Sequence, residues 1–355
     1  MPGEPAGQDS TAAARLRAAG AVILGKLYMV GSLGTPPSRD PWNLEHTPGG
    51  SSSGSGAALA ARMAQVTLGE QTAGSNIRPA AFCGVAGYKG TYGFLPRAGM
   101  FTMAWSHDHP GVMARSIEDV ALAVSVLAGL DPRDPTSLDT PAPSADLALG
   151  SLAPPRIGLV RNFFPDRTGE EMQAAVEAAA TRLADAGAEV VDFFLPDDFA
   201  LTWHAHHLVG AAEGSALHAR GDAADGILQN PLPGRYRREV SALLPATYYL
   251  HAQRLRRRLR VSYTDLFGGV DILLTGAAPG SAPKGLETSG DPVLQTPSSY
   301  LGFPTTTINA GLSPDGLPLG VQFMGAPMAD YAVLQWTAWC EGVLGRLPAP
   351  AMDWT

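Results

Sequence analysis

The stretch TPGGSSSGSGAALAARMAQVTLGEQTAGSNIRPAAFC, residues 47–83, contains two glycine and serine clusters on either side of an apolar segment. Glycines allow the backbone to approach a ligand closely, so that peptide N–H groups can face a developing negative charge, and the serines add hydroxyl groups. Between the clusters, Ala57–Met63 is rich in alanine and favours a helix, whereas Val66–Leu68 favours a strand. The order of loop, helix, strand and loop predicts that Ser75 returns close to Ser51.

Two other interpretations of these clusters are a flexible linker and a phosphate-binding loop. Composition alone would fit a glycine and serine linker. However, Trp42 and Leu44 lie before the clusters, and Phe82, Val85 and Tyr88 lie after them, which is the composition of packed protein. A phosphate-binding P-loop would end in Gly-Lys-Ser or Gly-Lys-Thr, and neither cluster does. The residues therefore favour a reaction site.

Motifs along most of the chain combine into one known pattern. They are RDPW at residues 39–42, PGGSSSGSGAA at 48–58, TAGSNIRPAAFCGVAGYKGTYG at 72–93, SHDHPGVMARSIEDVA at 106–121, TPSSYLGFPTTTINAG at 296–311 and GLPLGVQFMG at 316–325. On these motifs the chain is identified as a member of the amidase signature family of serine hydrolases, with a resemblance over roughly residues 10–345. The resemblance implies an α/β fold in which a mixed β-sheet is covered by helices on both faces.

The resemblance also implies an acyl-enzyme mechanism. Ser75 matches the family's nucleophile, and Ser51 matches a bridging serine on a cis peptide bond, which relays the proton. The reaction would cleave the carbon–nitrogen bond of a small-molecule amide, and it would require no metal or organic cofactor. The expected oxyanion hole is formed by the peptide N–H groups of Thr72, Ala73, Gly74 and Ser75, with Gly50 and Ser52 as supporting residues.

The family's third catalytic group, a lysine, has no counterpart in this chain. In the family it lies several dozen residues before the Gly-Lys pair that matches Gly25 and Lys26, and only about twenty-five residues precede that pair here. A serine hydroxyl needs a base, and a lysine can act as one when burial or other cations lower its pKa. Lys26 and Lys89 match family lysines that have no catalytic role.

Three explanations for the lysine are open. The recorded start lies too far downstream, the chain is a truncated or decayed homologue, or another residue replaces the base. We expect the loss or omission of an N-terminal segment. The same observation motivates a second function, a catalytically impaired homologue that acts as a binding or assembly protein. A third, a subunit for ammonia transfer to an aminoacyl-tRNA, would use the same chemistry but would need partner proteins.

Length and composition are those of a single α/β enzyme domain. The chain has 355 residues, 45% of them hydrophobic, and its net charge of −8 provides no basic surface for nucleic acid. Cys83 and Cys340 form neither a disulfide framework nor a metal-binding motif, so we expect a cytoplasmic protein. No apolar run is long enough to span a membrane, and no signal peptide is recognisable. The resemblance favours a homodimer.

Aromatic residues and histidines outside the serine clusters are further candidates. Trp105 lies in a segment that the resemblance places near the active-site mouth. Trp203 and His204 lie in a helical region, residues 200–265, that shapes the substrate pocket in the family, and we expect all three to contact substrate. A metal site is the alternative, although the spacing is not His-Glu-x-x-His. Its candidate ligands are His204, His206, His207, Glu213 and His218.

Hydrophobic periodicity and capping residues predict further elements. The predicted helices are Asp9–Ala19, Ile117–Leu127, Gly169–Ala186 and Asp330–Leu344. The predicted strands are Ala21–Leu24, Arg156–Val160, Ala188–Phe194, Asp271–Leu274, Ile308–Ala310 and Leu319–Met324. The two strands around the helix Gly169–Ala186 should form a strand-helix-strand unit with a right-handed crossover.

Overall fold

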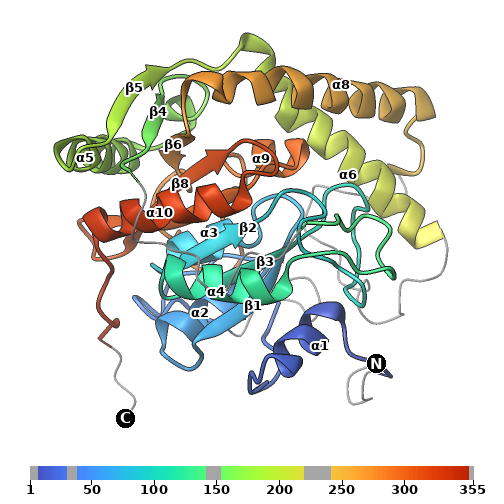
Figure 1. Ribbon diagram of the computed structural model, residues 1–355, viewed down its shortest axis with the longest axis horizontal. Coiled ribbons are helices and arrows are strands. Elements are labelled where there is room, and N and C mark those ends of the chain that lie inside the picture. The colour runs from blue at the N-terminus through green and yellow to red at the C-terminus, as the bar shows by residue number, and fades with distance from the viewer. Residues whose placement is uncertain (1–6, 30–37, 141–152, 220–240, 352–355) are drawn as a thin grey trace.

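A mixed sheet of eight strands lies at the centre of the computed structural model, which describes residues 7–29, 38–140, 153–219 and 241–351 (Figure 1). In their order across the sheet, the strands are β1 (Val66–Gln71), β3 (His109–Ala114), β2 (Ala86–Lys89), β7 (Thr305–Leu312), β8 (Pro318–Gly325), β6 (Ile272–Gly276), β4 (Arg156–Val160) and β5 (Glu189–Phe193). β4 is parallel to β5 and β6, and the other neighbouring pairs are antiparallel. The predicted mixed sheet is confirmed.

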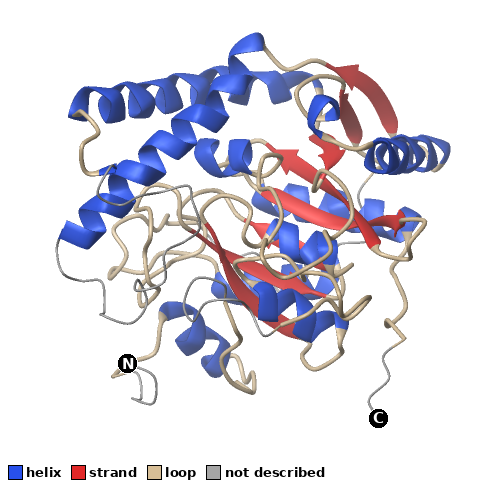
Figure 2. Ribbon diagram, turned by 180° about the vertical axis from the view of Figure 1, so that it is seen from behind, coloured by secondary structure: helices blue, strands red, loops and turns tan. Residues whose placement is uncertain are grey.

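Helices cover both faces of this sheet (Figures 1 and 2). The described helices are α1 (Thr11–Ala18), α2 (Ser53–Ala60), α3 (Ile77–Phe82), α4 (Ile117–Leu127), α5 (Glu170–Asp185), α6 (Leu201–Ala219), α8 (Ala246–Thr264), α9 (Thr296–Leu301) and α10 (Asp330–Leu344). On one face α4, α5 and α10 share a core cluster with the strands. On the other face α2 and α3 pack on the sheet, and α6, α8 and α9 surround a second cluster. None of these described helices has both the length and the apolar character of a membrane span.

Several local predictions agree with the structure. α4 and α10 have the predicted bounds, and Ser116 caps the start of α4, since its Oγ accepts a hydrogen bond from the N–H of Asp119 at 3.1 Å. β4, α5 and β5 form the predicted strand-helix-strand unit with parallel strands. These elements were predictable because their apolar side chains follow the period of the element and their ends carry capping residues.

Glycines on one face of the sheet allow α3 to approach closely. Side chains alternate between the faces of a strand, so Val321 of β8 joins the core cluster of α10 while Gly320 faces α3. A Cβ added to Gly320 would lie 2.6 Å from the Cβ of Ala81, and one added to Gly87 of β2 would lie 2.7 Å from the Cβ of Ala80. The missing side chains therefore set the position of α3 and of the loop that leads into it.

The first serine cluster is part of the fold and not a linker. Its serines begin α2, which packs beside β1 at the edge of the described sheet. Ser52 Oγ accepts a hydrogen bond from the N–H of Glu70 at 3.1 Å, and Ser55 Oγ donates to the carbonyl of Leu68 at 2.8 Å. Because an edge strand exposes backbone groups without partners, these serines take the place of a neighbouring strand.

The strand predicted at Ala21–Leu24 is absent from the structure. Residues 20–29 form neither helix nor strand, and the side chains of Val22 and Leu24 are 83% and 76% exposed. A strand requires a neighbouring strand to satisfy its backbone groups. Within the described residues the outer edge of β1 is occupied by the serines of α2, so the apolar pattern of this segment has no strand to pair with.

We expect Gly320→Ala to lower the free energy of unfolding by about 1–3 kcal/mol, because the new methyl group would overlap Ala81 on the closely packed α3. Gly342→Ala is the matched control, since a Cβ at Gly342 in α10 would meet nothing within 4 Å. Urea denaturation of both variants measures the difference. Equal stability of the two variants would contradict the close approach of α3 to the sheet.

Candidate functional site

The two serine clusters lie side by side, as the order of elements predicts. The N–H of Ser52 donates a hydrogen bond to the carbonyl of Ser75 at 3.1 Å, and the N–H of Ser53 donates to the carbonyl of Ser51 at 2.8 Å. Both Ser51 and Ser75 are half-buried. α2 and β1 form the short path between the clusters, so Ser52 and Ser75, which are 23 positions apart in the sequence, are in direct backbone contact.

The peptide bond between Gly50 and Ser51 is cis, which is the geometry that the resemblance implies for the bridging serine. Arg78 of α3 is fully buried, and its guanidinium group donates hydrogen bonds to the carbonyl of Gly50 and, at 3.2 Å, to Ser289 Oγ. Burial lowers the pKa of Arg78 to about 10, so the group stays charged near neutral pH. A buried cation thus contacts the backbone directly before Ser51.

Each carbonyl of the loop Thr72–Ser75 accepts a hydrogen bond from outside the loop. The donors to the carbonyls of Thr72, Ala73, Gly74 and Ser75 are His206 Nε2 at 2.9 Å, Ser299 Oγ at 2.7 Å, the N–H of Arg78 at 3.0 Å and the N–H of Ser52 at 3.1 Å. In a planar trans peptide the C=O and the following N–H point to opposite sides. The donors therefore also fix the directions of the N–H groups of Ala73, Gly74 and Ser75.

Within the part of the chain that the structure describes, the N–H groups of Thr72, Ala73, Gly74 and Ser75 donate to no protein atom. N–H groups without protein acceptors, next to a serine hydroxyl, can stabilise the negative charge that forms on a carbonyl oxygen during acyl transfer. The arrangement suits the oxyanion hole that the sequence predicted at these four residues.

Polar side chains that the sequence did not predict form hydrogen bonds around the loop. Gln71 Oε1 accepts hydrogen bonds from the N–H groups of Asn76 and Ile77 at 3.0 and 2.9 Å, and Gln71 Nε2 donates to Ser299 Oγ at 3.0 Å. Gln71 directly precedes the loop, and Ser299 lies in the motif TPSSYLG, so position in the motifs was the available signal. No pattern in the sequence connects the two residues, because they are 228 positions apart.

Asp108 supports the loop through the side chain of Thr72. Its Oδ1 accepts a hydrogen bond from Thr72 Oγ1 at 2.6 Å, and its Oδ2 accepts one from the N–H of Ala104 at 2.9 Å. Glu70 lies next to Asp108, and burial together with the charge of Asp108 raises the pKa of Glu70 well above its ordinary value. Burial also raises the pKa of Asp108, whereas the hydrogen bonds from Thr72 and from the N–H groups of Ala104 and Met103 favour its charged form.

No lysine of the chain contacts the two serines in the described structure. The sequence contains three lysines. Lys26 is exposed, Lys284 pairs with Glu45 at 2.9 Å, and buried Lys89 donates to the carbonyls of Phe303 at 2.5 Å and Gly90 at 3.1 Å. Burial lowers the pKa of Lys89 to about 7, but its amine is directed to these carbonyls. Among the described residues, neither serine hydroxyl has a hydrogen-bond partner.

Trp105, Trp203 and His204 are the three expected substrate contacts. Among the described residues, none of them forms a hydrogen bond or a ring contact with the serine loops. Trp105 is 53% exposed and lies under the guanidinium group of Arg97 at 4.4 Å. Trp203 packs against His207, with ring centroids 4.1 Å apart, and His204 is exposed. On α6 it is the neighbouring His206, fully enclosed, that reaches the loop.

Two of the alternative metal ligands, Glu213 and His206, bind other partners. Glu213 accepts hydrogen bonds from Ser106 Oγ at 2.7 Å and from Tyr249 Oη at 2.9 Å, which joins α6 to α8 and to the segment before β3. His206 bonds the carbonyl of Thr72. The side chain of His218 lies outside the described residues. In the described part of the chain, no three side chains of the metal-binding types gather into a group.

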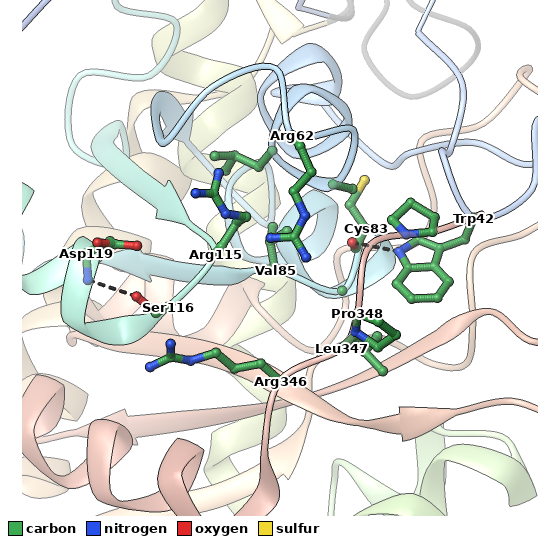
Figure 3. Close-up of a pocket in the computed structure, with 14 residues that line it drawn as sticks. Trp42, Arg62, Cys83, Val85, Arg115, Ser116, Asp119, Arg346, Leu347 and Pro348 are labelled. Atoms are coloured by element: carbon green, nitrogen blue, oxygen red, sulfur yellow. Dashed lines mark hydrogen bonds between the residues drawn. The ribbon is translucent and has the colours of Figure 1, made fainter. Parts of the chain in front are cut away.

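A separate hollow of about 250 Å³ opens between the end of α2 and residues 346–350 (Figure 3). Arg62, Arg115 and Arg346 line it together with Trp42. Neither serine loop contributes a lining residue. This hollow is therefore distinct from the candidate reaction site.

With the geometry of the serine loops established, comparison with known proteins decides the family. A family model described as Amidase matches residues 2–334. The chain belongs to the Amidase family. Members of the Amidase family are hydrolases of carbon–nitrogen bonds.

Named Amidase relatives include subunits of a transamidating enzyme. The chain is 34% identical over 380 residues to the A subunit of the Glutamyl-tRNA(Gln) amidotransferase of Geobacter metallireducens, covering 93% of this chain and 78% of the relative. It is 37% identical to the same subunit of Roseiflexus castenholzii, covering 92% of this chain and 74% of the relative.

Solved structures agree with the Amidase assignment. A chain from a "vestigial protein complex" that "reveals the evolutionary origins of an s-triazine catabolic enzyme" matches with a TM-score of 0.86 and 32% identity, covering 99% of this chain and 80% of that one. The A subunit of the Glutamyl-tRNA(Gln) amidotransferase of Thermotoga maritima matches with a TM-score of 0.84 and 26% identity, covering 98% of this chain and 80% of that one. The peptide amidase of Stenotrophomonas maltophilia matches with a TM-score of 0.77 and 26% identity, covering 97% of this chain and 78% of that one.

Asp40 lies in the RDPW motif of this Amidase chain, just before the first serine cluster. The side chain is fully buried, and Oδ1 accepts a hydrogen bond from the N–H of Trp42 at 3.0 Å. Oδ2 has no partner among the described residues. Burial raises the pKa of Asp40 to about 8, so the folded protein holds this carboxyl group in its neutral form.

We expect the Asp40 carboxyl group to make stability fall as the pH rises. The unfolded chain releases the proton near pH 4, whereas the folded chain keeps it until about pH 8. The folded state thus binds the extra proton between these values, and the contribution is present below about pH 4 and lost by about pH 8. Asp40→Asn removes this group. Urea denaturation from pH 5 to pH 8 should show a steeper loss for the unmodified protein than for the variant, and parallel curves would contradict the expectation.

Proposed function

We propose that this Amidase-family chain cleaves the carbon–nitrogen bond of a small-molecule amide through an acyl-enzyme on Ser75. The observation that carries the proposal is the loop Thr72–Ser75, in which every carbonyl accepts a hydrogen bond from outside and every N–H group lacks an acceptor among the described residues. The closeness of Ser51 to this loop supports its role as the bridging serine. Gly50 and Ser52 support the site through their backbone and side-chain contacts with Arg78, Ser75 and Glu70.

In the proposed reaction, Ser75 Oγ attacks the amide carbonyl carbon while its proton passes to Ser51, and the hydroxyl proton of Ser51 passes on to the leaving nitrogen. The carbonyl oxygen becomes an oxyanion and lies against the N–H groups of the loop, which stabilise the tetrahedral intermediate. The carbon–nitrogen bond then breaks, and the leaving amine takes the relayed proton. Water attacks the acyl ester, which releases a carboxylic acid and regenerates Ser75. The proposed steps use no metal or organic cofactor.

A second candidate function is ligand binding without turnover. The observation that favours it is the placement of the three lysines, none of which contacts Ser51 or Ser75 in the described structure. Without a proton acceptor a serine hydroxyl is a weak nucleophile. In this alternative the same loop would bind a carbonyl or carboxylate oxygen, and the protein would act in binding or assembly.

Other features of the proposal stay predictions of the sequence. Carbamates or esters fit the same acyl chemistry, and the amidotransferase subunits among the relatives raise ammonia transfer to an aminoacyl-tRNA as a related use of it. Trp105, Trp203 and His204 stay predicted substrate contacts. A homodimer and a cytoplasmic location also stay predictions.

We expect a fluorophosphonate serine probe to add once to the 355-residue chain and not to add to Ser75→Ala. The probe's phosphorus resembles the tetrahedral intermediate, so its reaction requires both an activated serine and an oxyanion hole. Intact mass spectrometry measures the adduct. Ser125→Ala, on the opposite face of the sheet in α4, is the control and should keep the adduct.

The outcomes separate the two candidate functions. An adduct that is lost in Ser75→Ala and kept in Ser125→Ala supports the acyl-enzyme. An adduct retained in Ser75→Ala would assign the reactive hydroxyl to another serine and overturn the proposal. No adduct on the unmodified chain would favour ligand binding without turnover.

A further inference from the structure

His206 connects the helical region to the candidate oxyanion loop. It lies on α6, 134 positions after Thr72, and its Nε2 forms a 2.9 Å hydrogen bond to the carbonyl of Thr72. The side chain is 4% exposed. Of the four donors to the loop carbonyls, only His206 and Ser299 are side chains; the other two are backbone N–H groups that α2 and α3 supply at their starts.

The ring of His206 is held in one plane. It stacks on His107, with centroids 4.3 Å apart and an angle of 8° between the rings. Burial lowers the pKa of His206 to about 3, and it also lowers the pKa of His107 well below its ordinary value. Both rings are therefore neutral near pH 7. A neutral imidazole carries one N–H, and the bond to a carbonyl requires that hydrogen on Nε2.

The hydrogen bond from His206 also fixes the direction of the N–H of Ala73. The carbonyl of Thr72 and the N–H of Ala73 belong to one planar trans peptide and point in opposite directions. A donor that fixes the carbonyl on the side of α6 therefore turns the N–H toward the opposite side, where it meets no acceptor among the described residues. Without the donor, this peptide plane could rotate, and the carbonyl of Thr72 and the N–H of Ala73 could bind other partners.

We propose that His206 is a positioning residue that aims the N–H of Ala73 at the oxyanion by holding the carbonyl of Thr72. This inference rests on the proposed acyl-enzyme function, because an oxyanion forms only if Ser75 reacts. The role belongs to the Nε2–H donor of His206, and stacking on His107 keeps that donor in place. The sequence predicted a substrate contact at His204 and not at His206, because the rotation of α6 decides which of its side chains faces the loop.

We expect His206→Ala to slow phosphonylation of Ser75 by the fluorophosphonate probe about 10- to 100-fold. Loss of a whole oxyanion donor costs about 100- to 1,000-fold, and a misdirected donor costs less. The rate constant of the chemical step should fall while the concentration for half-saturation changes little, because the N–H of Ala73 acts on the tetrahedral state and not on probe binding. Intact mass over time, at several probe concentrations, measures both constants on the full 355-residue chain.

Two further variants separate positioning from packing. His206→Gln keeps an N–H donor close to the position of Nε2 and should restore the rate to within a few-fold of the unmodified protein. His251→Ala, an exposed histidine on α8, should leave the rate unchanged. Equal loss in the alanine and glutamine variants of His206 would assign the effect to packing and overturn the proposal, as would an alanine variant that reacts at the unmodified rate.

Crystal structures of His206→Ala and His206→Gln provide a readout that does not depend on Ser75 reactivity. We expect the peptide plane between Thr72 and Ala73 to rotate in the alanine variant and to keep its direction in the glutamine variant. If the unmodified chain forms no adduct but the plane rotates, the acyl-enzyme fails while the positioning of the loop stands. If the plane keeps its direction in the alanine variant, the positioning role is wrong whatever the reactivity of Ser75.

Discussion

The direction of the peptide planes between Thr72 and Ser75 is the constraint on which the candidate site depends. A peptide unit is planar, so a donor that holds its carbonyl also determines where its N–H points. Here the donors come from the starts of α2 and α3, from α6 and from α9, which are far apart in the sequence. The loop has its shape only when all four elements are in position.

The sheet makes this arrangement sterically accessible. Gly87 and Gly320 leave room for α3 to lie on the strands, and the loop before α3 follows it to the same surface. β1 ends at Gln71, whose side-chain amide joins the two N–H groups at the start of α3 to Ser299. The glycines therefore place α3 on the sheet, and the hydrogen bonds from Gln71 hold its first turn there.

The geometry separates the two requirements of acyl-transfer chemistry. Stabilisation of an oxyanion is a property of the backbone, and the loop Thr72–Ser75 has groups that suit it. Deprotonation of the nucleophile is a property of a side chain near it. Within the described residues the lysines bind carbonyl groups or a carboxylate elsewhere, or are exposed. The backbone part of the proposed site is therefore formed independently of the proton acceptor.

The sequence by itself determined the family, the mixed sheet, the bounds of α4 and α10 and the return of Ser75 to Ser51. The motifs carry the resemblance to the family, and that resemblance implies the mixed sheet. The helix bounds and the return of Ser75 follow from capping residues, side-chain periodicity and the order of local elements, which act over a few residues. The strand expected at Ala21–Leu24 failed because pairing depends on a neighbouring strand, and the serines of α2 occupy the edge of β1. Only the tertiary structure decided that His206, Asp108, Gln71 and Ser299 surround the loop. His206, Asp108 and Ser299 reach the loop from distant parts of the chain, and Gln71, which directly precedes the loop, bonds to Ser299. Hydrogen bonds between such elements follow from their relative rotation and packing, which no local pattern records.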